Sequence, residues 1–443
     1  MTRVFRFCLI TAVIAAAVLF VPFSGSCQDE YDYINISEPF ADKIPMAMPV
    51  FKALSEGDTV EQAAVNAYEI MQESLSYTGY FKMVDRKAFL VDPENQGITP
   101  KDINLKNWRD IGAELLITGG VRRKADVLQM EFRLFDPYRG SVLLGKRYTG
   151  STGDQREMVL KFCSEVIRSL TGRRGLFESR IAFVGGEKGQ RAVYACDFDG
   201  QNLVRLTDPQ DIVVSPAWSP DGGSLAYTEY SDDHPNIYVF DLEAGQKKRF
   251  ASYEGINLTP AWQPGSQGLA ATLSFEGDEN IYLLTGTGKV DKKLTDSWGV
   301  DVSPSFSPDG SRMAFVSNRS GSPQVYVMDL ESGSVSRLTY DGKYNTQPDW
   351  SPVSDKIVYS GMKNGDINIY VIDAESGEKS RLTSGKGSNE APSWSPDGSM
   401  IVFTSTRSGL PQLYVMTASG TDQRRLLDMP GPQKLPDWSP ARQ

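Results

Sequence analysis

Few residues of this chain have the types and spacing that catalysis requires. The sequence contains a single histidine, His234, which is expected in a loop, so most general-base and transition-metal chemistry lacks its usual residue. A Gly-x-Ser-x-Gly motif does not occur, and His234 would have to be the sole base of any serine triad. Cys163 and Cys196, one in each expected domain, are predicted to be buried free thiols and not a disulfide. These residues predict a protein that is not an enzyme and has no cofactor and no metal site.

The most regular acidic residues are those of a repeated Ser-Pro-Asp-Gly motif, at Asp221, Asp309 and Asp397. They could be read as calcium ligands or as a catalytic carboxylate pair. In this motif, however, proline presets φ, aspartate accepts backbone N–H groups and glycine adopts φ > 0, which is the chemistry of a tight turn. The aspartates are therefore predicted to be structural. The net charge of −10 also argues against nucleic acid as a partner.

The dominant feature after residue 180 is a repeat of 44 residues without insertions. Three markers recur at this period: an aromatic residue in x-Pro-x-Trp-Ser-Pro, a tyrosine between apolar residues, and an apolar residue in Arg-Leu-Thr. The aromatic marker falls at Trp218, Trp262, Phe306, Trp350, Trp394 and Trp438, the tyrosine at Tyr194, Tyr238, Tyr282, Tyr326, Tyr370 and Tyr414, and the third marker at Leu206, Phe250, Leu294, Leu338, Leu382 and Leu426.

Each unit contains four short apolar segments separated by turn signals, which is typical of a β-propeller blade. We name these strands A (aromatic motif), B, C (tyrosine motif) and D (Arg-Leu-Thr). The first unit begins at strand B, residues 180–184, and the chain ends on a lone strand A, residues 435–440. The sequence therefore predicts a mainly β protein with a six-bladed propeller whose ring is closed by the C-terminal strand.

The region before the repeat divides into an export signal and a small α/β domain. Residues 1–26 have basic residues, an apolar run and small residues, which is the pattern of a signal peptide; a retained membrane anchor is the alternative. Capping pairs at Asp58–Glu61 and Asp154–Glu157 predict two helices, and strands are expected at 114–118, 128–136 and 142–149. The predicted domains are 1–26 signal peptide, 27–172 α/β domain with an extended N-terminal segment, and 176–443 propeller.

Cys27, directly after the small residues, leaves two expectations for export. Bacterial lipoprotein signals usually carry leucine three residues before the lipidated cysteine, and Ser24 stands at that place here. Release as a soluble protein is therefore favoured over lipid anchoring at Cys27.

The surface most suited to binding is expected where the repeat is least regular, in the D–A and B–C loops at one end of the propeller. Five of the six residues three places before the repeating proline are polar, and we expect this ring around the mouth of the central channel, beside aromatic residues of the same loops. The alternative is that the polar residues form turns and the aromatic residues cover neighbouring loops. The predicted partner-binding residues are Tyr253, Asn257, Thr259, Trp298, Asp301, Ser303, Tyr344, Asn345, Asn389 and Glu390.

Together, these features resemble the TolB family of the Gram-negative Tol–Pal system: an export signal, an α/β domain, the run Arg180-Ile181-Ala182-Phe183-Val184 and six blades that carry Trp-Ser-Pro-Asp-Gly or a variant of it. The resemblance implies a monomeric periplasmic scaffold that supports outer-membrane integrity and constriction at cell division. It implies that the propeller binds the lipoprotein Pal and that an N-terminal segment binds TolA; other outer-membrane lipoproteins are further candidates. The segment residues expected to take part are Tyr31, Tyr33, Ile34 and Ile36. The alternative is an exported propeller enzyme or carbohydrate-binding protein with a ligand in its channel.

Overall fold

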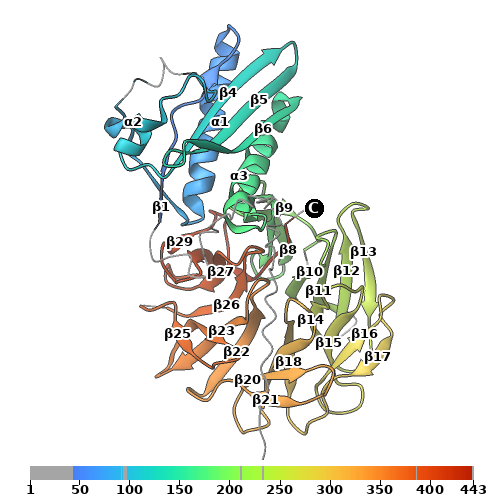
Figure 1. Ribbon diagram of the computed structural model, residues 1–443. Helices are drawn as coiled ribbons and strands as arrows, with labels where there is room; N and C mark the ends of the chain where they lie inside the picture. Colours follow the sequence, from blue (N-terminus) through green and yellow to red (C-terminus); the bar gives the residue numbers. More distant parts are fainter. Residues whose placement is uncertain are drawn as a thin grey trace, which may run out of the picture. The chain divides into compact units, whose positions relative to one another are not determined.

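The computed structural model describes residues 43–90, 92, 97–209, 212–231, 234–385 and 387–441. The predicted signal peptide, Cys27 and the segment residues Tyr31, Tyr33, Ile34 and Ile36 lie outside these ranges. In the part of the chain that is described, no helix is both long and apolar enough to cross a membrane. This part forms an α/β domain followed by six four-stranded sheets (Figure 1).

The α/β domain is a mixed sheet with two long helices, α1 and α3, packed on one face. The sheet order is β3-β1-β4-β5-β6, with β2 paired to β4; β1 runs parallel to β3 and β4, whereas β4, β5 and β6 form antiparallel pairs. The elements are β1 Ile44–Ala47, β2 Lys52–Ala53, α1 Asp58–Tyr77, β3 Phe81–Met83, η1 Arg86–Ala88, α2 Leu105–Asp110, β4 Leu115–Lys124, β5 Val127–Asp136, β6 Ser141–Ser151, η3 Thr152–Asp154, α3 Gln155–Thr171 and η4 Leu176–Glu178.

Both long helices lie where the sequence placed them, but their N-terminal caps differ from the prediction. Helix α1 is capped by Gly57, with no side-chain hydrogen bond, so the proposed capping box at Asp58 is wrong. Asp154 is the N-cap of α3 but accepts hydrogen bonds from the backbone N and Oγ of Ser151, because it belongs to the capping box of the preceding 3-10 turn η3. At its other end α3 stops at Gly172, whose φ of 76° is left-handed.

The six blades are antiparallel sheets in which sequence order equals spatial order, except at the seam. There the last strand, β30, pairs with β7, with Trp438 opposite Ile181, and so completes a blade begun some 250 residues earlier in the chain. The predicted six-bladed propeller with a split closing blade is confirmed. Blade one comprises β10 Val213–Trp218, β11 Ser224–Ser231, β12 His234–Asp241 and β13 Gln246–Ala251; blade two β14 Asn257–Trp262, β15 Leu269–Leu273, β16 Asn280–Leu284 and β17 Val290–Lys293; blade three β18 Asp301–Phe306, β19 Arg312–Ser317, β20 Gln324–Asp329 and β21 Val335–Arg337; blade four β22 Tyr344–Trp350, β23 Lys356–Lys363, β24 Asp366–Asp373 and β25 Lys379–Arg381; blade five β26 Asn389–Trp394, β27 Met400–Ser405, β28 Gln412–Thr417 and β29 Arg424–Arg425; blade six β30 Gln433–Trp438, β7 Arg180–Gly185, β8 Ala192–Asp197 and β9 Val204–Arg205.

The core of the propeller consists of separate apolar clusters between neighbouring blades. In one of them, Ala314 and Val325 of blade three pack against Trp350 and Ile357 of blade four. Apolar side chains therefore lie on both faces of a blade, as expected for a sheet packed between two others.

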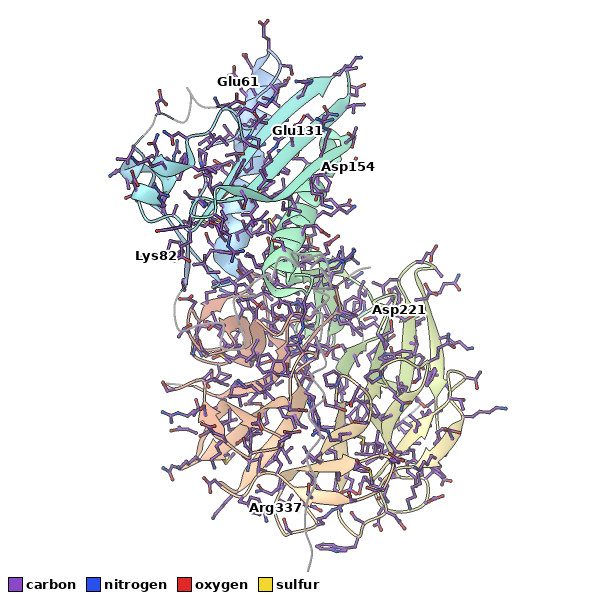
Figure 2. The ribbon with its side chains drawn as sticks, viewed as in Figure 1. Glu61, Lys82, Glu131, Asp154, Asp221 and Arg337 are labelled. Carbon is purple, nitrogen blue, oxygen red and sulfur yellow. The ribbon has the colours of Figure 1, made fainter. Side chains whose placement is uncertain are left out.

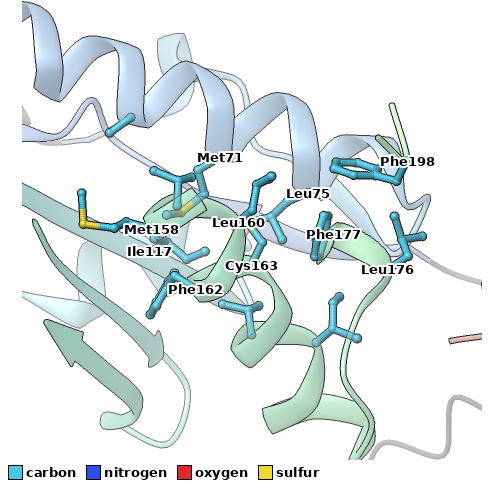
Figure 3. Close-up of a cluster of buried hydrophobic side chains, with 14 of the residues drawn as sticks. Met71, Leu75, Ile117, Met158, Leu160, Phe162, Cys163, Leu176, Phe177 and Phe198 are labelled. Carbon is cyan, nitrogen blue, oxygen red and sulfur yellow. The ribbon is translucent and has the colours of Figure 1, made fainter. Parts of the chain in front are cut away.

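The α/β domain packs against the propeller through the C-terminal end of α1. The Tyr77 hydroxyl donates to Phe198 O at 2.9 Å, and Arg424 donates to Tyr77 O at 2.7 Å while its guanidinium lies 3.8 Å from the Tyr77 ring centre. Phe177 and Phe198 meet edge to face, and Figure 3 shows them beside Leu75 of α1. These contacts all reach the ends of blades five and six where strand A joins B and strand C joins D.

Candidate binding surface on the propeller

The propeller has two chemically different ends. The end formed by the A–B and C–D turns contains the repeated Ser-Pro-Asp-Gly motif and contacts the α/β domain. In the first of these turns Asp221 accepts hydrogen bonds from Ser219 Oγ at 2.5 Å and Gly223 N at 2.9 Å, as expected for a structural aspartate. The other end is formed by the D–A and B–C loops, which differ from blade to blade. Figure 2 shows Asp221 at the first end and Arg337, beside a D–A loop, at the second.

Exposed aromatic side chains occur in two consecutive D–A loops of the second end and at the first residue of β22. Trp298 is 75% exposed, Tyr340 is 70% exposed and Tyr344 is 41% exposed. Tyr340 is also held under the guanidinium of Arg337, 4.8 Å from the ring centre. Leu410, 58% exposed, lies in a B–C loop of the same end. We call Trp298, Tyr340 and Tyr344 the loop aromatics. Large aromatic side chains that are this exposed are typical anchors of protein–protein interfaces.

Sequence reasoning found two of the three loop aromatics and missed Tyr340 and Leu410. Tyr340 directly follows the Arg-Leu-Thr motif of its blade and carries none of the repeat markers. The available signal was a large aromatic residue at the start of a D–A loop, where the repeat is least regular.

The polar residues of the predicted ring are buried. Residues 257, 301, 345, 389 and 433 are between 0% and 3% exposed, so the expectation that their side chains form an exposed ring is not met. Each side chain instead bonds back to its own D–A loop or to strand C. The amide of Asn257 donates to Tyr253 O, that of Asn345 to Asp341 O and that of Gln433 to Met429 O, always four residues earlier, at distances of 2.7, 2.7 and 2.9 Å. The side-chain amide donates to a main-chain carbonyl of the same loop and so stabilises the loop conformation. These buried side chains are therefore not available to a partner.

The acid of the ring, Asp301, is neutralised inside blade three. It accepts two hydrogen bonds from Nη2 of Arg319, at 3.1 and 2.9 Å, and one from Ser297 Oγ at 3.0 Å. The same guanidinium lies 5.2 Å from the Tyr326 ring centre. Asn389 is held in the equivalent way by Arg407, which donates to its Oδ1 at 2.8 Å. The side chains of Asp301 and Asn389 are therefore engaged in hydrogen bonds within their own blades.

Of the remaining predicted residues, Thr259 and Ser303 line the channel. Thr259 and Ser303 have φ values of 47° and 57° at the bulge of strand A, and the Ser303 N–H donates to Thr259 Oγ1 at 3.2 Å across two blades. Tyr253 is half-buried; its hydroxyl donates to Gly288 O and accepts from Val290 N, both at 3.0 Å. Glu390 is half-buried in β26.

A second inner ring links the blades and contains two carboxyl groups. The residue before the aromatic marker accepts the backbone N–H of that marker in the next blade: Asp349 from Trp394 N and Asp437 from Trp218 N, both at 2.7 Å. Burial raises the pKa of Asp349 to about 6. Burial, and then the nearby charge of Asp349, raise the pKa of Asp437 to about 8. Both residues line a cavity of about 780 Å³ that is the channel on the A–B turn side.

Among the described residues, the histidine and the two cysteines lie in separate parts of the structure. His234 is the first residue of β12, paired with Ser231, and not a loop residue as predicted. Cys163 and Cys196 are buried and free, as predicted, and burial raises the pKa of both thiols. Among the described residues, no group of three or more His, Cys, Asp or Glu side chains is arranged to hold a metal ion.

Fold and surface together define a two-domain protein: an α/β domain and a six-bladed propeller with exposed aromatic residues at the far end. The family description "TolB amino-terminal domain" matches residues 32–143, and "TolB beta propeller domain" matches residues 167–442. The chain therefore belongs to the TolB family and is a Tol–Pal system protein.

Individual relatives agree with this assignment. The chain is 53% identical over 210 residues to the Tol-Pal system protein TolB of Desulfosudis oleivorans, covering 47% of this chain and 48% of the relative. It is 41% identical over 222 residues to the TolB homolog of Chlorobaculum tepidum, covering 50% and 49%. These alignments span about half the length of the curated relatives. The crystal structure of TolB from Acinetobacter baumannii matches with a TM-score of 0.78 at 26% identity, covering 90% of this chain and 97% of that one.

Proposed function

We propose that this protein is a non-enzymatic periplasmic scaffold of the Tol–Pal system. In this proposal its propeller binds the lipoprotein Pal through the D–A and B–C loop end, and its N-terminal segment binds TolA. The protein thereby supports outer-membrane integrity and constriction at cell division. The observation that carries the proposal is the group of loop aromatics, which lies at the propeller end opposite the C–D turns that contact the α/β domain.

The channel supports the alternative, an enzyme or carbohydrate-binding protein, less well. An enzyme needs titratable groups that converge on a substrate. The carboxyl groups of Asp349 and Asp437 instead accept backbone N–H groups of neighbouring blades. Their geometry serves the closure of the ring.

The test is calorimetric titration of the periplasmic domain of Pal into the full chain and its variants. Replacing Trp298 and Tyr344 together by alanine should weaken binding by at least tenfold, because exposed aromatic anchors contribute about 1–4 kcal/mol each when buried in an interface. The matched control is Tyr138→Ala, which removes an exposed tyrosine from the α/β domain. Unchanged affinity of the double variant, or equal loss in the control, would contradict this assignment of the binding end.

Export is tested by the intact mass of the protein isolated from cells. A mature chain that begins at Cys27 with an unmodified thiol is expected. Diacylglycerol on Cys27 would overturn soluble release and leave the binding proposal intact.

A further inference from the structure

Strand β6 is the long outer strand of the structure. It has 11 residues, Ser141–Ser151, and ends the sheet of the α/β domain. The opposite outer strand of this sheet, β3, has 3 residues, and the outermost strands of the blades have between 2 and 6. A long outer strand leaves a row of unpaired N–H and C=O groups, and proteins usually keep such strands short unless they pair with another chain.

A defined stretch of β6 is open on its outer side. Leu134 of β5 pairs with Leu144 and Phe135 with Val142, so Leu143 is an extra residue and forms a bulge. At the other end Ser151 is tied to Asp154. Between these points, within the described chain, no backbone hydrogen bond reaches β6 from any element but β5. We call the seven residues Leu144–Gly150 the β6 edge; Figure 1 shows β6 as the outer strand beside β5.

The charges along the β6 edge determine what could pair with it. Residues 137–151 contain Arg139, Lys146 and Arg147 and no acidic residue. Lys146 lies on the helix-covered face, 3.9 Å from Glu165, and Arg147 lies on the other face, 2.9 Å from Glu131. Their side chains are nevertheless 46% and 61% exposed. If two copies of the chain paired symmetrically along this strand, Lys146 of one copy would face Lys146 of the other. The like charges disfavour self-association.

The apolar side chains of the edge alternate with these charges. Leu144 and Tyr148 are half-buried on the core face, with Gly145 and Thr149 on the other face. A β-carbon on Gly145 would meet only the Cγ of Arg133, at 3.8 Å, so the outer face there is open. An incoming strand would therefore find apolar contacts at Leu144 and Tyr148, on either side of Lys146, and a positive charge on each face.

We propose that the β6 edge is a docking site for an extended, acidic segment of a partner protein, which adds as a further strand to the sheet of the α/β domain. Main-chain hydrogen bonds supply the affinity, and acidic side chains opposite Lys146 and Arg147 supply the selectivity. This surface belongs to the α/β domain and is separate from the loop aromatics of the propeller.

The test uses the full chain and a fluorescein-labelled eight-residue peptide of alternating glutamate and valine, followed by fluorescence anisotropy and amide hydrogen exchange. The comparison peptides are an alternating lysine–valine peptide and the glutamate–valine peptide methylated at every second backbone nitrogen. The variant is Lys146→Gln with Arg147→Gln. Its matched control is Lys248→Gln with Lys292→Gln, which removes two exposed lysines from short outer strands of the propeller.

We expect the acidic peptide to bind, to slow amide exchange within residues 144–150, and to bind the Lys146/Arg147 variant at least tenfold more weakly than the control variant. The lysine peptide and the methylated peptide should not bind. Absence of binding, equal binding by the methylated peptide, or equal affinity of the two variants would each overturn the proposal. Protection of residues 144–150 that appears with rising protein concentration alone, together with a dimer in light scattering, would assign the edge to a second copy and also overturn it.

Discussion

Closure of the propeller at its seam depends on Trp438, and replacing this residue by alanine tests that dependence directly. Trp438 is 6% exposed in the last strand. Its indole N–H donates to Ser179 Oγ at 2.8 Å, and its backbone N–H donates to Ser393 Oγ at 3.1 Å. The side chain thus fills the space between the split blade, its neighbour and the segment that leads out of the α/β domain.

The expected loss is large compared with the stability of a typical protein. Truncating a buried tryptophan to alanine costs about 3–5 kcal/mol, since apolar contact is lost and a cavity remains. Ser179 keeps a partner, because its hydroxyl also donates to Leu176 O. Native proteins are stable by about 5–15 kcal/mol, so Trp438→Ala should remove a substantial part of the margin. Trp298→Ala is the matched control: this tryptophan is 75% exposed, and the expected change is within about 0.5 kcal/mol.

Thermal and urea unfolding, followed by tryptophan fluorescence and by circular dichroism, measure both variants. We expect the melting temperature of Trp438→Ala to fall by roughly 5–15 °C and that of Trp298→Ala to stay near the parent value. Deleting residues 435–443 should have a still larger effect and cause aggregation, because it exposes the edge of β7. Equal melting temperatures for the two tryptophan variants, or a monomeric deletion variant with unchanged melting, would refute the role assigned to the seam.

Three further predictions concern the channel, the domain contact and the N-terminal segment. The raised pKa values of Asp437, about 8, and Asp349, about 6, mean that the folded state holds these protons more tightly than the unfolded state. The protonated carboxyl groups therefore stabilise the fold fully below about pH 4, and this contribution is lost as the pH rises through 6 to 8. Asp437→Asn should flatten the fall in urea midpoint between about pH 5 and 9, and an unchanged slope would contradict this. Arg424→Ala should cost about 1–3 kcal/mol and speed amide exchange at the C-terminal end of α1, because both the ring contact and the hydrogen bond to Tyr77 are lost. The control is Arg139→Ala, which removes an exposed arginine and its ion pair with Asp136 and should have little effect. Deleting residues 28–38 should abolish TolA binding and preserve folding. If the docked or free state of this segment is coupled to the Pal site by about 1–3 kcal/mol, the deletion should also change the affinity for Pal severalfold in calorimetry. Equal Pal affinities would show that the segment is only a tether.

The amino-acid sequence by itself determined the architecture of the propeller. Turn residues such as Asp221 and Gly222 act within a few residues of chain, and aromatic markers at a constant period must occupy equivalent places in equivalent blades. Even the split blade followed from strand order, because a chain that begins at strand B and ends at strand A can leave no free edge only if its two ends pair. The export signal, by contrast, lies outside the described residues and stays a prediction.

The binding surface was decided by tertiary structure. A polar residue in an irregular loop can face solvent or bond back to its own loop, and the sequence alone does not distinguish these cases. Asn257 and Asn345 are buried because the amide of each lies within reach of a carbonyl four residues earlier, a distance that only the folded loop defines. Trp298 and Tyr340 are exposed on the assembled ring, whereas Trp438, of the same type as Trp298, is buried and bonds to Ser179, more than 250 positions away. Exposure is a property of the assembled ring, and so is the surface that a partner can touch.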